Sequence, residues 1–363
     1  MTFIGHFKKI DWVLVISAIC LTSFGLVSIY GMAVNSGDFT FFKKQLFFFI
    51  IGFFLMLFFS FFDYRTLRAN SYLIFSLYII FCFLLLGLLF FAQEIRGIKG
   101  WYRIGPFSFD PIPFLAIILL LLLSRYFSKY HIEIYNFRHL LTSFGYTFIP
   151  FFLIFLQPNL GSGLLLIFLW FSVIMFSGIK ISHFLILLLI FSLIFSFSWF
   201  FLLKDYQKQR VITFLNPRLD PRGISWNINQ SKIAIGSGGI LGKGIGKGSQ
   251  TQSGFLPEPK TDFIFSAIAE ETGFLGISLL FLFLLIFIWR IIKIVLYSSN
   301  NFSRLFASGF AFFFFIQSFI NIGMSFGILP IIGVPLPLVS YGGSQLLSFY
   351  LGLGLIQSIK VYG

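Results

Sequence analysis

Long apolar runs separated by short polar segments dominate this chain. The runs do not alternate as the strands of a membrane β-barrel would, and about 20 apolar residues are enough to cross roughly 30 Å of hydrocarbon as a helix. Ten spans are expected, at about 12–31, 45–62, 72–91, 111–128, 141–156, 160–178, 183–203, 263–289, 305–328 and 343–359. The sequence therefore predicts an all-α integral membrane protein, with residues 1–363 forming one polytopic domain.

Composition excludes a soluble globular domain. The chain is 58% hydrophobic and 10% charged, and its mean hydropathy is +0.95. Soluble domains are about 45–50% apolar and about 25% charged. The first run, from Trp12 to Tyr30, is longer than the core of a signal peptide and no small-residue cleavage pattern follows it. It is therefore expected to remain as a span.

Basic residues in the loops predict the orientation. With the N-terminus inside, the cytoplasmic segments hold twelve Lys and Arg, the opposite short loops hold five, and the long segment 204–262 holds nine. The positive-inside rule then places both termini in the cytoplasm and segment 204–262, a large and partly ordered loop, outside. The net charge of +14 is spread over both faces, which favours anionic membrane lipid over nucleic acid as a partner. The four histidines lack metal-ligand spacing, so no metal site is predicted.

Two shorter outer connections depart from plain spans. The loop 96–114 places Trp101, Tyr102 and Arg103 at headgroup depth, which fits either an interfacial anchor or part of a site. The run QPNLGSG at 157–163 predicts a tight reversal between the fifth and sixth spans, and its spacing alone requires no other role.

Segment 204–262 carries a glycine-rich loop, Gly236–Gly254, with eight glycines. Glycine amides can approach an anion closely, and Lys243 and Lys247 add positive charge. The spacing does not match a nucleotide-binding P-loop. An anion cradle and simple loop flexibility both remain open.

Carboxylates are scarce and concentrated. Six of the twelve acidic residues lie between positions 205 and 271, and Asp262 stands just before the eighth span in LPEPKTDFIFSAIAEE. Glu270 and Glu271 follow about 12 Å further along a helix, beyond the usual reach of a glycosidase carboxylate pair. Glu270 is the better candidate to share a cavity with Asp262, since Glu271 points to the opposite side. Pairing of both glutamates with nearby Lys or Arg is the alternative.

The run LPEPKTDFIFSAIAEETGFLG resembles the SEDS family of cell-wall synthases, named for shape, elongation, division and sporulation. NQSKIAIGSGGILGKG (229–244) and NIGMSFGILPIIGVPLPLVSYGGS (321–344) favour its RodA-like elongation branch over the FtsW-like division branch. The resemblance covers nearly the whole chain. It implies a ten-helix peptidoglycan glycosyltransferase of the bacterial inner membrane that polymerises lipid II. Its implied partners are a class B penicillin-binding protein, which acts as a transpeptidase, and other elongation-complex proteins.

The resemblance also implies residue roles. The family's essential carboxylate corresponds to Asp262, its arginine before TFLNP to Arg210, and its QSK to Gln230, Ser231 and Lys232, which we take as substrate-binding candidates.

Arg103 and Glu270 join these substrate-binding candidates because both are expected on the outer side. The sequence departs from the family at DPIP, where a glutamate and its lysine partner are replaced by Pro113 and Ala116, and at Asn159, which replaces an aspartate. Loss of both members of an ion pair leaves no orphan charge.

The expected chemistry is glycosyl transfer. The acceptor 4-hydroxyl loses a proton to Asp262 as it attacks the anomeric carbon of the donor. The departing pyrophosphate needs positive charge, which Arg210, Lys232 and Arg103 could supply. No cofactor is indicated by the sequence, although a divalent cation, Mg²⁺ or Mn²⁺, could act in the same way. Two rival classes are a flippase for the lipid-linked precursor and a noncatalytic scaffold for a transpeptidase.

Overall fold

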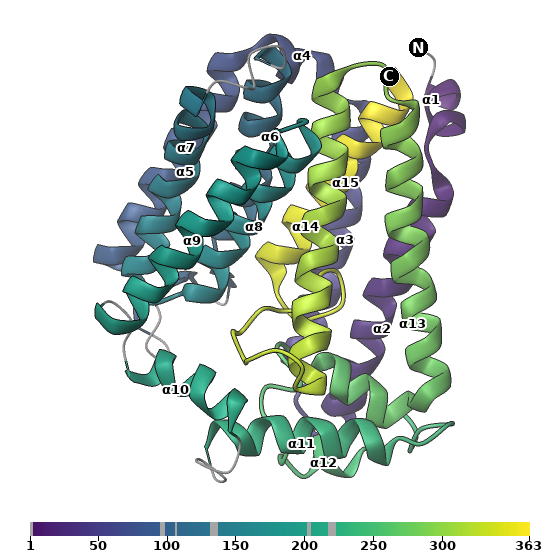
Figure 1. Cartoon of the computed structure of the whole chain (residues 1–363). Helices are drawn as coiled ribbons and strands as arrows, with labels where there is room; N and C mark the ends of the chain where they lie inside the picture. Colours follow the sequence, from purple (N-terminus) through teal and green to yellow (C-terminus); the bar gives the residue numbers. More distant parts are fainter. Residues whose placement is uncertain (1–2, 95–98, 106, 131–136, 202–204, 217–222) are drawn as a thin grey trace.

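A computed structural model describes residues 3–94, 99–105, 107–130, 137–201, 205–216 and 223–363. Long helices run up and down through the molecule, and both termini lie at the same end (Figure 1). The polar helices of segment 204–262 cover the opposite end (Figure 1).

Ten long helices occur among the described residues. Eight of them are long and apolar enough to cross a membrane. Each of the ten matches an expected span, with ends that differ by at most eight residues, at the C-terminal end of α13, so the predicted all-α membrane class is confirmed. The ten are α2 (Trp12–Ser36), α3 (Thr40–Phe61), α5 (Ser71–Phe91), α6 (Ile112–Lys129), α7 (Phe137–Leu156), α8 (Leu160–Phe176), α9 (Ile181–Phe201), α13 (Ile264–Tyr297), α14 (Asn301–Phe326) and α15 (Gly343–Tyr362).

Helices α8 and α15 are the two of the ten that do not meet the criteria of length and apolar composition. Helix α8 has only 17 residues. Helix α15 is enclosed by protein, mainly α3, and several of its interior polar groups have partners there. Gln357 Nε2 donates to Asp11 O at 3.1 Å, and Ser358 Oγ donates to Phe62 O at 2.7 Å. A helix shielded from lipid need not be apolar on every face.

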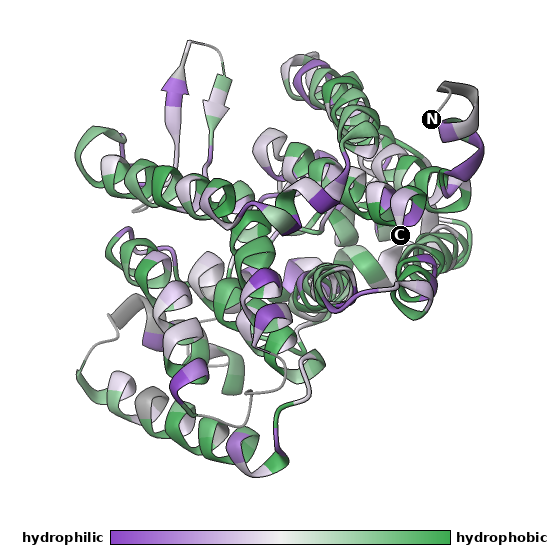
Figure 2. Cartoon of the chain, turned by 90° about the horizontal axis from the view of Figure 1, so that it is seen from above, coloured by the Kyte–Doolittle hydropathy of each residue, from purple (hydrophilic) through white to green (hydrophobic). Residues whose placement is uncertain are grey.

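Shorter elements connect the bundle. Segment 204–262 holds three helices in its described part, and a two-stranded antiparallel hairpin precedes α6. The hairpin projects from the side of the bundle when the molecule is seen from above (Figure 2). These elements are α1 (Phe3–Lys9), α4 (Tyr64–Ala69), β1 (Tyr102–Ile104), β2 (Phe107–Phe109), α10 (Asp205–Leu215), α11 (Ile224–Ser237) and α12 (Ser249–Gln252).

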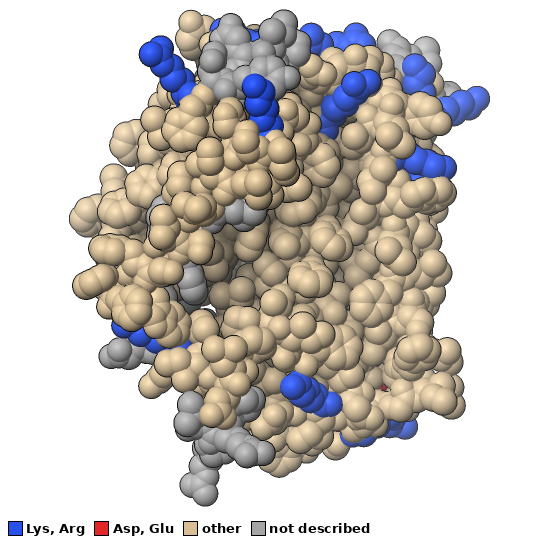
Figure 3. All heavy atoms as spheres, viewed as in Figure 1, with Lys and Arg blue, Asp and Glu red and all other residues tan. Residues whose placement is uncertain are grey.

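A band free of charged side chains surrounds the middle of the face drawn in Figure 3, with Lys and Arg at its two ends. Elsewhere on the bundle, large apolar side chains such as Phe54, Phe58 and Phe83 are also exposed rather than buried in the core. Because such exposure is unfavourable in water, this band is the surface that meets lipid. The chain is a multi-pass membrane protein.

Polar residues set the starts of several helices. Asp11 Oδ1 accepts the N–H of Leu14 at 3.1 Å and begins α2. Asn159 Oδ1 accepts the N–H of Ser162 at 3.3 Å and begins α8. These side chains satisfy amides that have no partner inside the helix. The substitution at Asn159 noted in the sequence therefore retains a helix cap.

Glycine allows α2 to approach the segment that precedes α15. A Cβ at Gly25 would overlap the carbonyl oxygen of Val339. Close backbone contact through small residues is the usual way in which membrane segments pack.

Replacing Gly25 by alanine should therefore destabilise the protein. We expect a loss of about 1–3 kcal/mol, because backbone cannot give way as a flexible side chain would. The measurement is the midpoint of thermal unfolding of the purified protein in detergent. Gly145→Ala, within α7 with open space around its Cβ position, is the matched control and should be neutral or stabilising by about 0.5–1 kcal/mol. Equal midpoints for Gly25→Ala and the wild type would contradict this packing.

Candidate active site

Asp262 follows an irregular turn at the end of the bundle opposite the termini, directly before α13. Glu258, between two prolines, adopts a left-handed φ of +43°. Its carbonyl oxygen accepts from the N–H of Thr261 and of Phe263, both at 3.2 Å. Local backbone strain of this kind persists only where surrounding contacts impose it, and it is common at functional sites.

Three consecutive carbonyls of this turn accept hydrogen bonds from donors elsewhere in the chain. Lys260 O accepts from the N–H of Tyr341 at 2.8 Å, and Thr261 O accepts from Ser340 Oγ at 2.7 Å. Asp262 O accepts from Asn321 Nδ2 at 2.9 Å. The backbone of Asp262 is thus fixed by side-chain and main-chain donors about 60 to 80 residues away in sequence.

The donors are themselves held in place. Asn321 Nδ2 also donates to Val334 O at 2.8 Å, which ties α14 to the 327–342 segment. Gln45 on α3 donates to Ser340 O and accepts from the N–H of Gly342, each at 3.2 Å. The clamp therefore connects α3, α14 and the start of α15. No pattern in a single sequence singled out Asn321, Ser340 or Tyr341, although all three lie within the third resembling run.

The Asp262 side chain is partly exposed. Gly333 approaches it with a left-handed φ of +74°, and a Cβ there would lie 3.7 Å from Asp262 Oδ2. A partly exposed carboxylate on a rigid turn retains a defined direction and access to a reactant. These are the properties required of a general base.

The QSK run lies on α11, which packs against α13 and α14. Lys232 is exposed and its side chain lies against Gly327, where a Cβ would overlap it. Gln230 is half-buried. Both remain candidates for binding substrate.

Ser231 needs a correction. It is fully buried, its hydroxyl donates to Ser325 O at 2.6 Å, and it accepts from Ser266 Oγ at 2.6 Å. This hydroxyl joins α11 to α13 and α14, so its position favours a role in holding the helix that carries Lys232 over direct binding of substrate.

The two arginine candidates, Arg210 and Arg103, lie on α10 and on the hairpin. Arg210 lies on α10, and its side chain falls outside the described part of the structure. Arg103 is exposed on β1 opposite Ser108. Among the described residues, no hydrogen bond or ion pair joins Arg103 to Asp262 or Lys232.

Glu270 also needs a correction, because it does not share an open cavity with Asp262. Its side chain is fully buried and forms an ion pair with Lys243 at 2.8 Å. The carboxylate also accepts from the N–H of Gln250 at 2.8 Å and of Thr251 at 2.9 Å. Pairing with a nearby lysine, the alternative considered from the sequence, is what the structure shows. Glu270 anchors the glycine-rich loop.

The same loop fills a break in α13. Gly273 has φ +65° and ψ −162°, which interrupts the helix. Lys243 N and Gly244 N donate to the carbonyls of Glu270 and Glu271, at 3.0 and 2.9 Å. Phe274 N donates to Gly239 O at 2.9 Å. The loop amides at Lys243 and Gly244 are therefore used by the helix break and are not available to cradle an anion.

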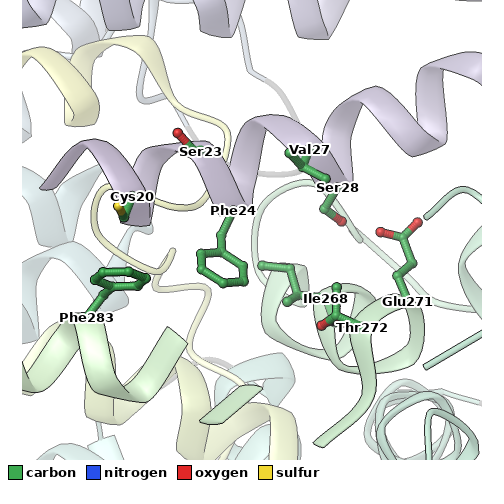
Figure 4. A pocket seen from close by; sticks show the side chains of 9 residues that line it. All are labelled: Cys20, Ser23, Phe24, Val27, Ser28, Ile268, Glu271, Thr272 and Phe283. Carbon is green, nitrogen blue, oxygen red and sulfur yellow. Dashed lines mark hydrogen bonds between the residues drawn. The ribbon is translucent and has the colours of Figure 1, made fainter. Parts of the chain in front are cut away.

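Glu271 lies at a cavity of about 250 Å³ between α2 and α13. Its carboxyl group and the Ser28 hydroxyl point toward each other across the gap (Figure 4). Glu271 Oε1 accepts from the N–H of Gly246 at 3.1 Å. Glu271 therefore holds the loop from the other side of α13. The remaining lining includes Phe24, Val27, Ile268 and Phe283 and is mainly apolar.

No group of three or more His, Cys, Asp or Glu converges among the described residues. A divalent cation at Asp262 would therefore need further ligands of other kinds, such as backbone carbonyls, water or a substrate.

Asp110, directly after β2, joins the end of the hairpin to α15. Its N–H donates to Ser344 Oγ at 2.9 Å, and its Oδ1 accepts from the N–H of Ile112 at 2.9 Å. Desolvation raises the pKa of this carboxyl to about 7, against the opposing effect of the Ile112 hydrogen bond. Pro113 and Ala116, where the sequence departs from the family pattern, follow in the first turns of α6, and Ala116 is buried.

The long apolar helices, with Asp262 held on a turn at the end of the bundle opposite the termini, define a polytopic membrane protein. The sequence profile of the FtsW/RodA/SpoVE cell cycle proteins matches residues 9–363. The chain belongs to this family.

Relatives of established name extend the comparison. The chain is 38% identical over 286 residues to the peptidoglycan glycosyltransferase MrdB of Escherichia coli K12, which covers 79% of this chain and 77% of that protein. It is 34% identical to stage V sporulation protein E of Bacillus subtilis, over 97% of both chains. It is 30% identical to the peptidoglycan glycosyltransferase RodA of Treponema pallidum, over 96% of this chain and 97% of that one.

Solved structures of related proteins share the fold of this chain. A chain described under "Structural coordination of polymerization and crosslinking by a peptidoglycan synthase complex" superposes with a TM-score of 0.81 at 29% identity, covering 97% of both chains. The crystal structure of the Thermus thermophilus rod shape determining protein RodA superposes with a TM-score of 0.69 at 26% identity, covering 97% of this chain and 96% of that one.

Glu270→Gln should release the glycine-rich loop. An amide cannot accept from all the donors that meet this carboxylate, and Lys243 would lose its partner, so we expect a loss of about 3–5 kcal/mol. Hydrogen exchange should become faster at the amides of Gln250 and Thr251. The exposed Lys247→Gln is the control and should leave exchange at these amides unchanged. Wild-type protection in Glu270→Gln would show that the carboxylate does not anchor the loop.

The raised pKa of Asp110 should make stability depend on pH. Between about pH 4 and pH 7 the folded carboxyl keeps its proton while the unfolded one ionises, so its contribution to stability falls as pH rises. Asp110→Asn removes this titration. The unfolding midpoint of the wild type, relative to that of Asp110→Asn, should therefore fall as pH rises from 4.5 to 8. A difference that is constant over this range would contradict the assignment.

Proposed function

We propose that this chain is a peptidoglycan glycosyltransferase that polymerises lipid II into glycan strands for cell elongation. The names of its relatives support the activity. The observation that carries the mechanism is the partly exposed Asp262 carboxylate on a turn held by Asn321, Ser340 and Tyr341.

The chain would lie in the bacterial inner membrane with both termini in the cytoplasm. Basic residues of the short loops favour this orientation. Since α10, α11 and α12 cover the end opposite the termini (Figure 1), Asp262 would then act at the outer leaflet. A lipid-linked disaccharide would enter sideways, with its polyprenyl tail in the bilayer and its sugars at the level of α11.

Asp262 acts as the general base in this proposal. Its carboxylate takes the proton of the acceptor 4-hydroxyl as the hydroxyl oxygen bonds to the anomeric carbon of the donor. The bond from that carbon to the pyrophosphate oxygen breaks, and lipid pyrophosphate departs with the electron pair. Pyrophosphate is a good leaving group, so no second carboxylate is needed as an acid. The burial of Glu270 is compatible with this single-carboxylate chemistry.

Positive charge stabilises the leaving group. Lys232 is the best-placed candidate, because its exposed side chain lies at the C-terminal end of α14, the same helix that supplies Asn321. Arg210 on α10 and Arg103 on the hairpin are further candidates on the same side. Mg²⁺ or Mn²⁺ held by the pyrophosphate could add to this charge.

A class B penicillin-binding protein is the proposed transpeptidase partner, acting within an elongation complex. Support comes from the solved relative whose description joins polymerization and crosslinking in one synthase complex.

Asp262→Asn should abolish strand formation while leaving folding and membrane insertion intact. Loss of a general base costs about 10²–10⁴-fold in rate, and the asparagine retains the shape of the side chain. Purified protein with labelled lipid II, assayed with and without the partner, should produce glycan strands and undecaprenyl pyrophosphate only when residue 262 is aspartate.

Asp38→Asn provides the matched control. Asp38 is an exposed carboxylate between α2 and α3 that accepts from the N–H of Thr40 at 2.9 Å, and asparagine can keep that bond. Its polymerisation rate should equal the wild-type rate. Wild-type rates for Asp262→Asn would remove Asp262 from the mechanism and favour a scaffold role. Movement of labelled lipid II across vesicles without pyrophosphate release would favour a flippase.

A further inference from the structure

A basic cleft of about 610 Å³ opens at the end of the bundle that holds both termini, far along α13 from Asp262. It is formed by the end of α1, the start of α2, the later part of α13 and the end of α15. Lys8, Lys9, Arg290 and Lys360 line it, with Asp11 as its acidic residue. Its volume lies within the range of about 300–1,000 Å³ that is usual for small-ligand sites.

The floor of the cleft is a buried ion pair. Arg290 Nε donates to both carboxylate oxygens of Asp11 at 3.0 Å, and the Asp11 side chain is 1% exposed. Asp11 N donates to Gln357 Oε1 at 2.9 Å, which joins this pair to α15. The pair cancels its own charge and fixes the relative positions of α2, α13 and α15. The cleft is therefore a built feature of the fold.

Three lysines on the rim carry the remaining charge. Lys8, Lys9 and Lys360 are exposed, and no carboxylate of the described residues lies within ion-pair distance of any of them. A terminal carboxylate on Gly363, which also lines the cleft, would offset one of these three charges. The rim therefore offers two to three uncompensated positive charges to one ligand.

The surroundings of the cleft place it at headgroup depth. Trp12 is 41% exposed at the mouth, and its Nε1 donates to Phe7 O at 3.0 Å. Trp289, next to Arg290, is 51% exposed. Tryptophan gathers at the membrane–water boundary. Below Trp12, the exposed Val13 and Ile16 continue along the outward face of α2, so an acyl chain could follow directly from the cleft.

We propose that this cleft binds the headgroup of an anionic phospholipid that carries two phosphates. Two phosphodiesters match the two to three free positive charges, and basic pockets between membrane helices are known to select such headgroups. The site is distinct from Asp262, and its occupancy does not depend on glycosyl transfer. Lys8, Lys9 and Lys360 contact phosphate, while the acyl chains lie along α2.

Native mass spectrometry of the purified full-length protein, with added diphosphatidylglycerol, tests the site. Each lysine should contribute about fivefold in affinity, so the Lys8→Gln, Lys9→Gln, Lys360→Gln triple variant should lose about 100-fold. Lys360→Gln alone, on the long helix α15, should lose about fivefold. This single variant keeps the test valid should the two changes in short α1 disturb folding.

The control variant removes the same number of positive charges at the same end of the bundle. Arg68→Gln, Lys129→Gln and Lys180→Gln remove three exposed basic residues that do not line the cleft and should leave retention of the lipid unchanged. Equal losses in both triple variants would mean that overall charge binds the lipid, and unchanged retention in the cleft variants would overturn the site. Displacement of the lipid by millimolar inorganic pyrophosphate, with the same lysine dependence, would overturn a lipid source in favour of a soluble anion.

Discussion

Backbone polar groups that lack a partner are costly wherever water is excluded, and this cost organises the end of the molecule opposite the termini. Two irregular segments meet there, the turn before α13 and the 327–342 segment, and Tyr341 N and Ser340 Oγ of the second donate to carbonyls of the first. Asn321 of α14 donates to the carbonyls of Asp262 and Val334, one in each segment. The rigidity of the candidate base follows from this mutual satisfaction. A change in either segment would leave buried donors or acceptors in the other.

Buried carboxylates stabilise the fold through ion pairs at both ends of the bundle. Glu270 holds the glycine-rich loop through Lys243, and Asp11 holds the start of α2 to α13 through Arg290. Both also accept backbone N–H groups, which offsets the cost of burying their charge. Asp262 differs in kind: its backbone carbonyl is committed to the fold while its carboxylate is partly exposed. This division lets one residue be fixed in position and still open to chemistry.

The departures from the family pattern fit the local structure. Pro113 lies in the first turn of α6, where a missing N–H costs nothing, and Ala116 is buried, where a lysine without its glutamate would be an orphan charge. Asn159 retains the cap of α8. Polymerisation as proposed requires none of the lost charges. The desolvated Asp110 at the same corner is a titratable group that the family pattern does not predict.

The sequence by itself determined the membrane class, the ten long helices and Asp262 as the residue of greatest interest. Span length and apolar composition are local properties, and a long quoted motif is also local, so both can be recognised without coordinates. Tertiary structure alone decided the roles of Ser231, Glu270 and Asn321. Whether a hydroxyl or carboxylate faces a substrate or a neighbouring helix depends on what lies opposite it, and those partners are 19 to 94 residues away in the chain. Side chains that look alike in sequence are therefore separated only by the packing around them.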